Sequence, residues 1–280
     1  MRTAVVGHVE WVEFARVERL PVSGEIVHAA DAWAEPAGGG GVASVQLARL
    51  AGSCTLFTAL GRDAAGERAL SELRALGVRV EARRHAEPQR RAFTFVEAGG
   101  ERTITIIGEK HVPRGGDPLA WDDLAGTDAV YLVSGDAAAA RAARRARVLV
   151  ATARVLPVLA EAGVELDALV RSESDMDERY ETGDLQPAPR LAVATAGAAG
   201  GAWTAADGRS GTYDVVPPPG PLEDTYGAGD SFAAGLTYAL GRGEPAEAAV
   251  AFAARCASVA LSRRGAHGRA PARTERPPGA

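Results

Sequence analysis

An acidic residue stands at the start of a predicted helix in the stretch DTYGAGDSFAAGLTYAL, residues 224–240. Apolar residues after Asp230 recur at helical spacing, and the glycines before it let the backbone approach a ligand closely. The first amides of a helix lack partners and attract anions, so this segment is typical of an anion-binding site. A carboxylate beside a bound phosphate repels it, unless it accepts a proton from the hydroxyl that attacks the phosphate. Asp230 is therefore a candidate general base, with a helix N-cap as the structural alternative.

Composition narrows the class of protein. The 280 residues, 46% of them hydrophobic, are enough for one large domain or two small ones. A net charge of −5 argues against a nucleic-acid partner, because such partners bind basic surfaces. No apolar stretch is long enough to span a bilayer or to act as a secretory leader, and Cys54 and Cys256 lack metal or disulfide spacing. We expect a soluble cytoplasmic protein with neither a nucleic-acid nor a membrane partner.

Short β-type runs alternate with Ala- and Leu-rich helical segments, which is typical of βαβ units around a mostly parallel sheet. Helices are expected at 42–52 and 64–77. The expected strands are 3–7, 54–61, 129–135, 148–152, 167–172 and 190–197. These strands are apolar on both faces, as strands buried between two layers of helices are. The sequence therefore predicts an α/β fold, followed by a flexible tail at 268–280 that is rich in Pro, Arg and Gly.

One region departs from this alternation. Residues 91–108 contain two β-rich runs around a pair of glycines, which predicts a hairpin. Its expected partner is the β-like segment 13–33. Together they would form a small separate sheet, a lid, whose exposed edge near Phe93 and Phe95 favours association of two subunits into a homodimer.

The segment DTYGAGDSF, from Asp224 to Phe232, resembles the C-terminal signature D-T-x-G-A-G-D-x-F of the ribokinase-like (PfkB) carbohydrate kinases. The resemblance covers most of the chain and implies one domain, residues 1–267, with a three-layer α/β/α fold and a small β lid. It implies that Asp230 accepts the proton of the substrate hydroxyl. The amides of Gly227, Ala228 and Gly229 would then hold the transferring phosphate, and a monovalent cation, K⁺, would bind Asp224, the Tyr226 carbonyl and backbone at 261–266.

Two further motifs of this family concern the acceptor, and both are altered. The Gly-Gly-x-x-x-Asn motif before the first helix has Ala43 in place of its sugar-binding Asn, and Val12 replaces a sugar-binding Asp after the first strand. The loss of two polar groups predicts an acceptor different from that of a standard ribokinase. Four consecutive glycines are also typical of a flexible loop. The resemblance assigns to the acceptor side Gly38, Gly39, Glu10, Val12 and Ala43.

The nucleotide side is marked by T-x-G-x-x-G, present as Thr195, Gly197 and Gly200. The family motif N-x-x-E, which helps to organise magnesium, is degenerate, with Ser172 and Asp175 in its place. Asp175 is a candidate for holding Mg²⁺ through water, and a solvated surface acid is the alternative. The resemblance thus implies ATP and Mg²⁺ as cofactors.

These features predict ATP-dependent phosphorylation of a hydroxyl group on a sugar or a sugar-like small molecule. Two alternatives remain open. In the first, the acceptor is a nucleoside or a phosphosugar, and Arg90, Arg91, Arg102 or Arg154 would supply positive charge for a phosphorylated acceptor. In the other alternative the chain is a catalytically weak, ligand-binding regulatory member of the family, as the altered motifs allow.

Overall fold

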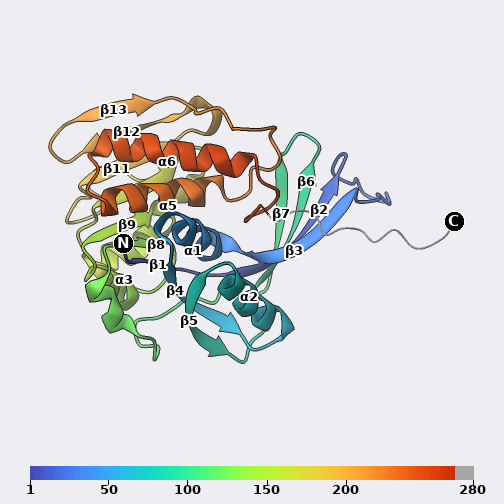
Figure 1. Cartoon of the computed structure of the whole chain (residues 1–280), viewed down its shortest axis with the longest axis horizontal. Coiled ribbons are helices and arrows are strands. Elements are labelled where there is room, and N and C mark those ends of the chain that lie inside the picture. Colours follow the sequence, from blue (N-terminus) through green and yellow to red (C-terminus); the bar gives the residue numbers. More distant parts are fainter. Residues whose placement is uncertain (269–280) are drawn as a thin grey trace.

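The computed structural model describes residues 1–268, which form two β-sheets and the helices around them (Figure 1). Among these residues the larger sheet has nine strands in the order β13-β12-β11-β10-β9-β8-β1-β4-β5. Its strands are β1 Thr3–Val6, β4 Cys54–Gly61, β5 Val78–His85, β8 Ala129–Leu132, β9 Val148–Thr152, β10 Ala168–Ser172, β11 Leu191–Thr195, β12 Gly201–Ala205 and β13 Ser210–Tyr213. The pairs β11–β12 and β12–β13 are antiparallel, and the other pairs of this sheet are parallel.

Helices cover both faces of the larger sheet. On one face lie α1 (Gly38–Ala51), α2 (Ala64–Ala75), α5 (Ala228–Gly241) and α6 (Ala246–Leu261), and on the other lie α3 (Ala137–Ala143) and α4 (Leu156–Ala162). Val5 of β1 packs with the first group, whereas its neighbours Ala4 and Val6 pack with the second. Because successive side chains of a strand point to opposite faces, both must be apolar here. The predicted three-layer α/β/α fold with a mostly parallel sheet is confirmed.

The smaller sheet extends from one side of this layered body (Figure 1). Its strands, in the order β3-β2-β6-β7, are β3 Asp31–Ala37, β2 Glu10–Val17, β6 Arg91–Glu97 and β7 Arg102–Ile107. The predicted hairpin at 91–108 is β6 and β7, and β6 pairs with β2 as the predicted lid requires. We call this the lid sheet. Its early strands reach beyond 13–33 at both ends, because β2 follows closely on β1 and β3 runs directly into α1.

An apolar cluster joins the lid sheet to the layered body. Phe14 of β2 stacks on Trp33 of β3 at 4.8 Å and meets Tyr226 edge to face at 5.1 Å. Val42 of α1 belongs to the same cluster. Residues 224–229 therefore touch both the body and the lid sheet.

The glycines at 38–41 are part of a helix, not of a turn before one. Helix α1 begins at Gly38, and a Cβ at Gly40 would lie 2.6 Å from the His8 carbonyl oxygen. The glycines thus allow α1 to pack directly against the backbone that leaves β1. Four glycines are poor helix formers, so this packing outweighs local propensity.

Other elements were not predicted from the sequence, namely β5, β12, β13, α3, α4 and α6. Short 3₁₀ helices also occur at η1 Trp121–Gly126, η2 Ala153–Val155, η3 Met176–Glu178 and η4 Gly197–Ala199. None of the helices within residues 1–268 has the length and apolar character to cross a bilayer. The predicted flexible tail falls outside the described residues except for Gly268.

Candidate active site

Candidate residues from distant parts of the chain gather where β1 ends and α1 and α5 begin. A Cβ placed on Gly39 would lie 3.0 Å from Asp230 Oδ1 and 3.6 Å from His8 Cε1. Asp230 and His8 therefore lie close to the same point of α1. This is the carboxyl edge of the parallel strands, where open α/β sheets bind their ligands.

The start of α5 offers unpaired amides next to Asp230. Gly227 is the N-cap residue with φ of 74°, and its carbonyl accepts the amide of Ser231 at 2.8 Å. The amides of Ala228, Gly229 and Asp230, in the first turn of α5, have no such partner within the helix. Gly229 is exposed, with nothing within 4 Å of an added Cβ. An anion can thus reach this end of the helix, where the helix dipole favours negative charge.

Asp230 is half-buried, and its carboxylate accepts no hydrogen bond from residues 1–268. Its protein surroundings raise the pKa of Asp230 to about 6, mainly because burial penalises the charged form. The negative charge of Glu178 adds to this, and the positive charges of Arg154 and Arg102 oppose it. Such a carboxyl group is ionised at neutral pH and is still basic enough to accept a proton.

The acceptor-side residues form a polar group beside Gly38. Glu10 pairs with Arg90, with Nε and Oε1 2.8 Å apart, and lies 3.8 Å from His8 Nε2. Burial raises the pKa of Glu10, and Arg90 opposes that rise. Burial lowers the pKa of His8 to about 3, so the ring is neutral, and its Nδ1 is 3.3 Å from the Ser134 hydroxyl.

Val12 and Ala43, the two altered sugar-binding positions, have no exposed surface. Val12 packs in the apolar cluster beneath the lid sheet, and Ala43 packs in the core under α1. Neither side chain can offer a hydrogen bond. Any effect of these positions on acceptor choice therefore comes from the polar groups that they lack.

Asp175 forms a hydrogen bond and an ion pair with other residues of the protein. It accepts the amide of Asp177 at the start of η3 and forms an ion pair with Arg154. Arg154 also pairs with Glu178 at 2.9 Å, and the Ser172 amide donates to Glu178 at 2.8 Å. Of these acids, Glu178 acts on the pKa of Asp230. No cluster of three or more His, Cys, Asp or Glu side chains suited to a metal ion occurs among residues 1–268.

The T-x-G-x-x-G residues form the tight turn between β11 and β12. Thr195 ends β11, and the Ala196 amide donates to the Gly200 carbonyl at 2.8 Å. Gly197 and Gly200 have φ of 55° and 79°, and a Cβ on Gly200 would lie 2.1 Å from the Tyr213 carbonyl oxygen. The turn needs glycine for its own geometry. It lies at the same edge of the sheet as Asp230.

Two buried carboxyl groups lie under the lid near the predicted monovalent-cation site. Asp224 accepts the amides of Tyr226 at 2.7 Å and Gly265 at 3.1 Å, and burial raises its pKa. Glu35 of β3 accepts the next amide, that of Ala266, at 2.7 Å. Burial raises the pKa of Glu35 to about 7, and its Oε2 has no hydrogen-bond partner in the structure.

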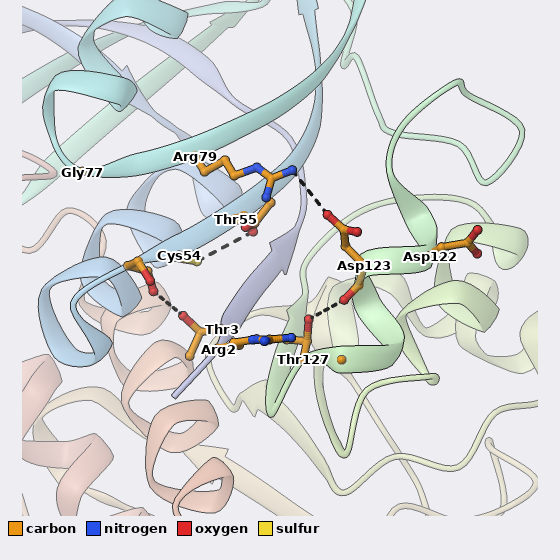
Figure 2. Close-up of a pocket in the computed structure, with 11 residues that line it drawn as sticks. Arg2, Thr3, Cys54, Thr55, Gly77, Arg79, Asp122, Asp123 and Thr127 are labelled. Carbon is orange, nitrogen blue, oxygen red and sulfur yellow. Dashed lines mark hydrogen bonds and ion pairs between the residues drawn. The ribbon is translucent and has the colours of Figure 1, made fainter.

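The hollow drawn in Figure 2 lies at the opposite edge of the sheet. It measures about 590 Å³ and is lined at the amino ends of the strands by Thr3, Cys54 and Thr127. The ion pair between Arg79 and Asp123 spans part of its rim. None of the predicted site residues lines it.

Sequence reasoning overlooked several residues of the site. His8 and Glu178 carried no motif, and their importance follows only from the residues that surround them. Glu35 lies just beyond the predicted β-like segment 13–33 and belongs to no motif. Lys110 had a detectable signal, because it is the only lysine in the chain.

A helix terminus that can hold an anion, with a basic carboxylate beside it at the carboxyl edge of a parallel sheet, suits a phosphotransferase that uses an alcohol group as acceptor. The family model for the pfkB family of carbohydrate kinases matches residues 2–163 and 164–273. The chain belongs to this family.

Individual relatives agree with this membership. The ATP-dependent ribose-1-phosphate kinase of Halopiger xanaduensis is 28% identical over 286 residues, which cover 95% of this chain and 94% of that protein. A putative ribokinase from Agrobacterium tumefaciens has a similar structure, with a TM-score of 0.79, 22% identity and coverage of 95% and 93%. The ribokinase of Arabidopsis thaliana, solved with ribose and ATP, gives a TM-score of 0.70, 21% identity and coverage of 94% and 93%. The two solved structures support the ribokinase fold.

Proposed function

We propose that this carbohydrate kinase transfers the γ-phosphoryl group of ATP to a hydroxyl of a sugar or sugar-like acceptor, with Asp230 as the general base. The observation that carries this proposal is the half-buried Asp230, whose carboxylate is basic and accepts no hydrogen bond from residues 1–268, beside the unpaired amides of α5. The acceptor oxygen attacks phosphorus as Asp230 takes its proton. The amides of Gly227, Ala228 and Gly229 stabilise the charge on the phosphoryl oxygens.

ATP would lie toward the turn of Thr195, Gly197 and Gly200, and the acceptor toward Gly38, Gly39 and Glu10. Magnesium supplies charge neutralisation on the nucleotide phosphates when it is bound. Acidic groups suited to magnesium are present in Glu178 and, through water, in Asp175, although Arg154 competes for both. A monovalent cation would use Asp224 and the Tyr226 carbonyl, and the unpartnered oxygen of the neighbouring Glu35 supports a cation there.

A screen for ADP release tests this function. The panel contains free sugars, nucleosides and sugar phosphates, each with Mg-ATP, and the Asp230→Asn variant supplies the background rate. We expect at least one compound to support ADP release well above that background. If none does so while ATP still binds, the chain is a ligand-binding regulatory member of the family and the catalytic proposal fails.

We also propose a homodimer that forms through the lid sheet. The expected edge near Phe93 and Phe95 was wrong, because β6 lies between β2 and β7. Strand β7 is the edge strand, and its Ile104, Ile106 and Ile107 are 40–45% exposed. An exposed apolar edge strand is a ready site for association. In sedimentation experiments we expect a dimer, which Ile106→Lys converts to a monomer and Val215→Lys, at an exposed apolar residue outside the lid, does not. A wild-type protein that is monomeric at every micromolar concentration would contradict the proposal.

A further inference from the structure

Lys110 is unusual in this chain, because the other 30 of its 31 basic residues are arginines. Lysine and arginine are not interchangeable. Lysine presents a compact ammonium group on a flexible stem, whereas arginine presents a planar fork that suits fixed ion pairs. The arginines of this protein form many such pairs with surface acids, for example Arg79 with Glu81 and Arg190 with Glu165. A single lysine therefore points to a task that differs from surface pairing.

The segment around Lys110 is fixed beside the end of β1. His111 is buried, its Nε2 bonds to the Pro88 carbonyl at 2.8 Å, and its ring stacks on His85 at 4.9 Å. Gln89 is buried as well, and its Nε2 donates to the Val9 carbonyl at 2.7 Å. Arg90 directly follows Gln89, and Lys110 directly precedes His111. Both therefore stay near His8 and Glu10.

Three cations act on the neutral ring of His8, namely Lys110, Arg90 and Arg154. Arg90 is held by Glu10, and Arg154 is held by Asp175 and Glu178. Lys110 is half-buried and forms no ion pair with any group in residues 1–268. Burial and the charges of Arg90 and Arg154 lower the pKa of Lys110, and the negative charge of Glu10 opposes them. Glu10 already pairs with Arg90, so a half-buried ammonium group near two other cations would be stabilised by a further anion.

We propose that Lys110, together with Arg90 and Arg154, binds a phosphate ester carried by the acceptor, so that the acceptor is a phosphorylated sugar. The proposal rests on the proposed kinase function. Phosphate suits this site because an ammonium group is a good point-charge partner for it and the neutral His8 can share a hydrogen bond. A second phosphate would occupy the start of α5, where the transferring group belongs.

The reaction keeps the acceptor's own phosphate unchanged. A free hydroxyl of the phosphosugar forms a bond to the γ-phosphorus of ATP, the bond from that phosphorus to the β–γ bridging oxygen breaks, and ADP leaves. The hydroxyl proton moves to Asp230. The product is a sugar bisphosphate, and the cations around His8 take no part in bond making.

Because Lys110 is the only lysine, amine-selective acetylation reads its environment directly. The protein's only other reactive amine is the N-terminus, and peptide mass mapping separates the two. The probes are ribose, ribose 1-phosphate, ribose 5-phosphate, fructose 6-phosphate, inorganic phosphate and ATP. We expect at least one sugar phosphate to slow the acetylation of Lys110 about 10-fold or more, with no effect of free ribose and no change at the N-terminus. If no sugar phosphate changes the acetylation rate of Lys110 from that of the ligand-free protein, the proposal is overturned. Protection by ATP alone would also overturn it, because Lys110 would then belong to the nucleotide site.

This binding assay needs no turnover, so it separates failure of the phosphate site from failure of the kinase function. For an active enzyme, Lys110→Met is compared with Lys110→Arg and with the control Arg190→Met, whose arginine pairs with the exposed Glu165. We expect Lys110→Met to raise the KM for the phosphorylated acceptor about 10- to 100-fold, the scale of one charge-assisted hydrogen bond. The KM for ATP should stay within about twofold, and Lys110→Arg should recover part of the loss. A rise in the KM for ATP instead, or an equal loss with unphosphorylated acceptors, would contradict the assignment.

Discussion

Replacing Asp230 with asparagine should lower kcat by about 10² to 10⁴, the usual contribution of a positioned general base. The amide has nearly the same shape but cannot accept the hydroxyl proton. Because residues 1–268 donate no hydrogen bond to the Asp230 carboxylate, the exchange should disturb the fold little. Steady-state kinetics and calorimetric titration with ATP would measure the effect, and we expect the Kd for ATP to change by no more than about twofold.

The pH profile supplies an independent test of the same assignment. The pKa of Asp230 is about 6, so kcat/KM of the wild type should fall as the pH drops below about 6 and the base becomes protonated. The Asn variant should lack this acidic limb in its residual activity. In Glu178→Gln, loss of a negative charge that raises the pKa of Asp230 should move the limb to lower pH. Asp230→Asn with near-normal turnover and an unchanged pH profile would refute Asp230 as the base.

The second large effect is expected at Gly227, where alanine should lower kcat by about 10² to 10³, the scale for disturbing one anion-stabilising donor. Gly227 has φ of 74°, a conformation that a side chain opposes, and an added Cβ would lie 2.9 Å from Val42 Cγ1. Val42 belongs to α1, so relief of the contact shifts α5 against α1 and moves the amides near Asp230. Single-turnover kinetics with saturating ATP would isolate this loss from binding.

Gly243→Ala is the matched control for backbone strain. Gly243 also has a positive φ, 82°, but it follows α5 at the far end of that helix and has nothing within 4 Å of an added Cβ. Both variants should lose about 1 kcal/mol of stability through the positive φ, and Gly227→Ala should lose more because of its contact with Val42. Only Gly227→Ala should lose the rate of phosphoryl transfer. If the two variants lose kcat equally, the close contact between position 227 and Val42 does not affect phosphoryl transfer.

The strands at the centre of the larger sheet could be predicted because they are buried on both faces. β4, β9 and β11 are continuous apolar runs, and only a strand between two helix layers requires such a run. β5 escaped prediction because it is an edge strand in which Val78 and Val80 alternate with Arg79 and Glu81. Its stability comes from pairing with β4 and from α2, which composition alone does not reveal.

The predicted site residues were found through local motifs, and the others were not. The contiguous GAGD segment specifies both a helix terminus and an acid, so Asp230 and Gly227 were identifiable without a structure. Glu178, His8 and Lys110 act through space on one another or on Asp230 from three separate segments. No spacing rule connects them, because their proximity depends on how β1, β10 and the lid sheet end at one edge.

The sequence by itself determined the fold class, the hairpin and the family, because each depends on short-range patterns of apolar residues, glycines and one long motif. Tertiary structure alone decided that Gly38 to Gly41 form a helix, since close packing against the backbone at His8 requires residues without a Cβ. The tertiary structure also decided which charged groups act on Asp230 and Lys110. Burial and neighbouring charges give Asp230 a pKa of about 6, and folding leaves Lys110 half-buried without an ion pair in the described part of the chain. Neither property exists until the chain is folded.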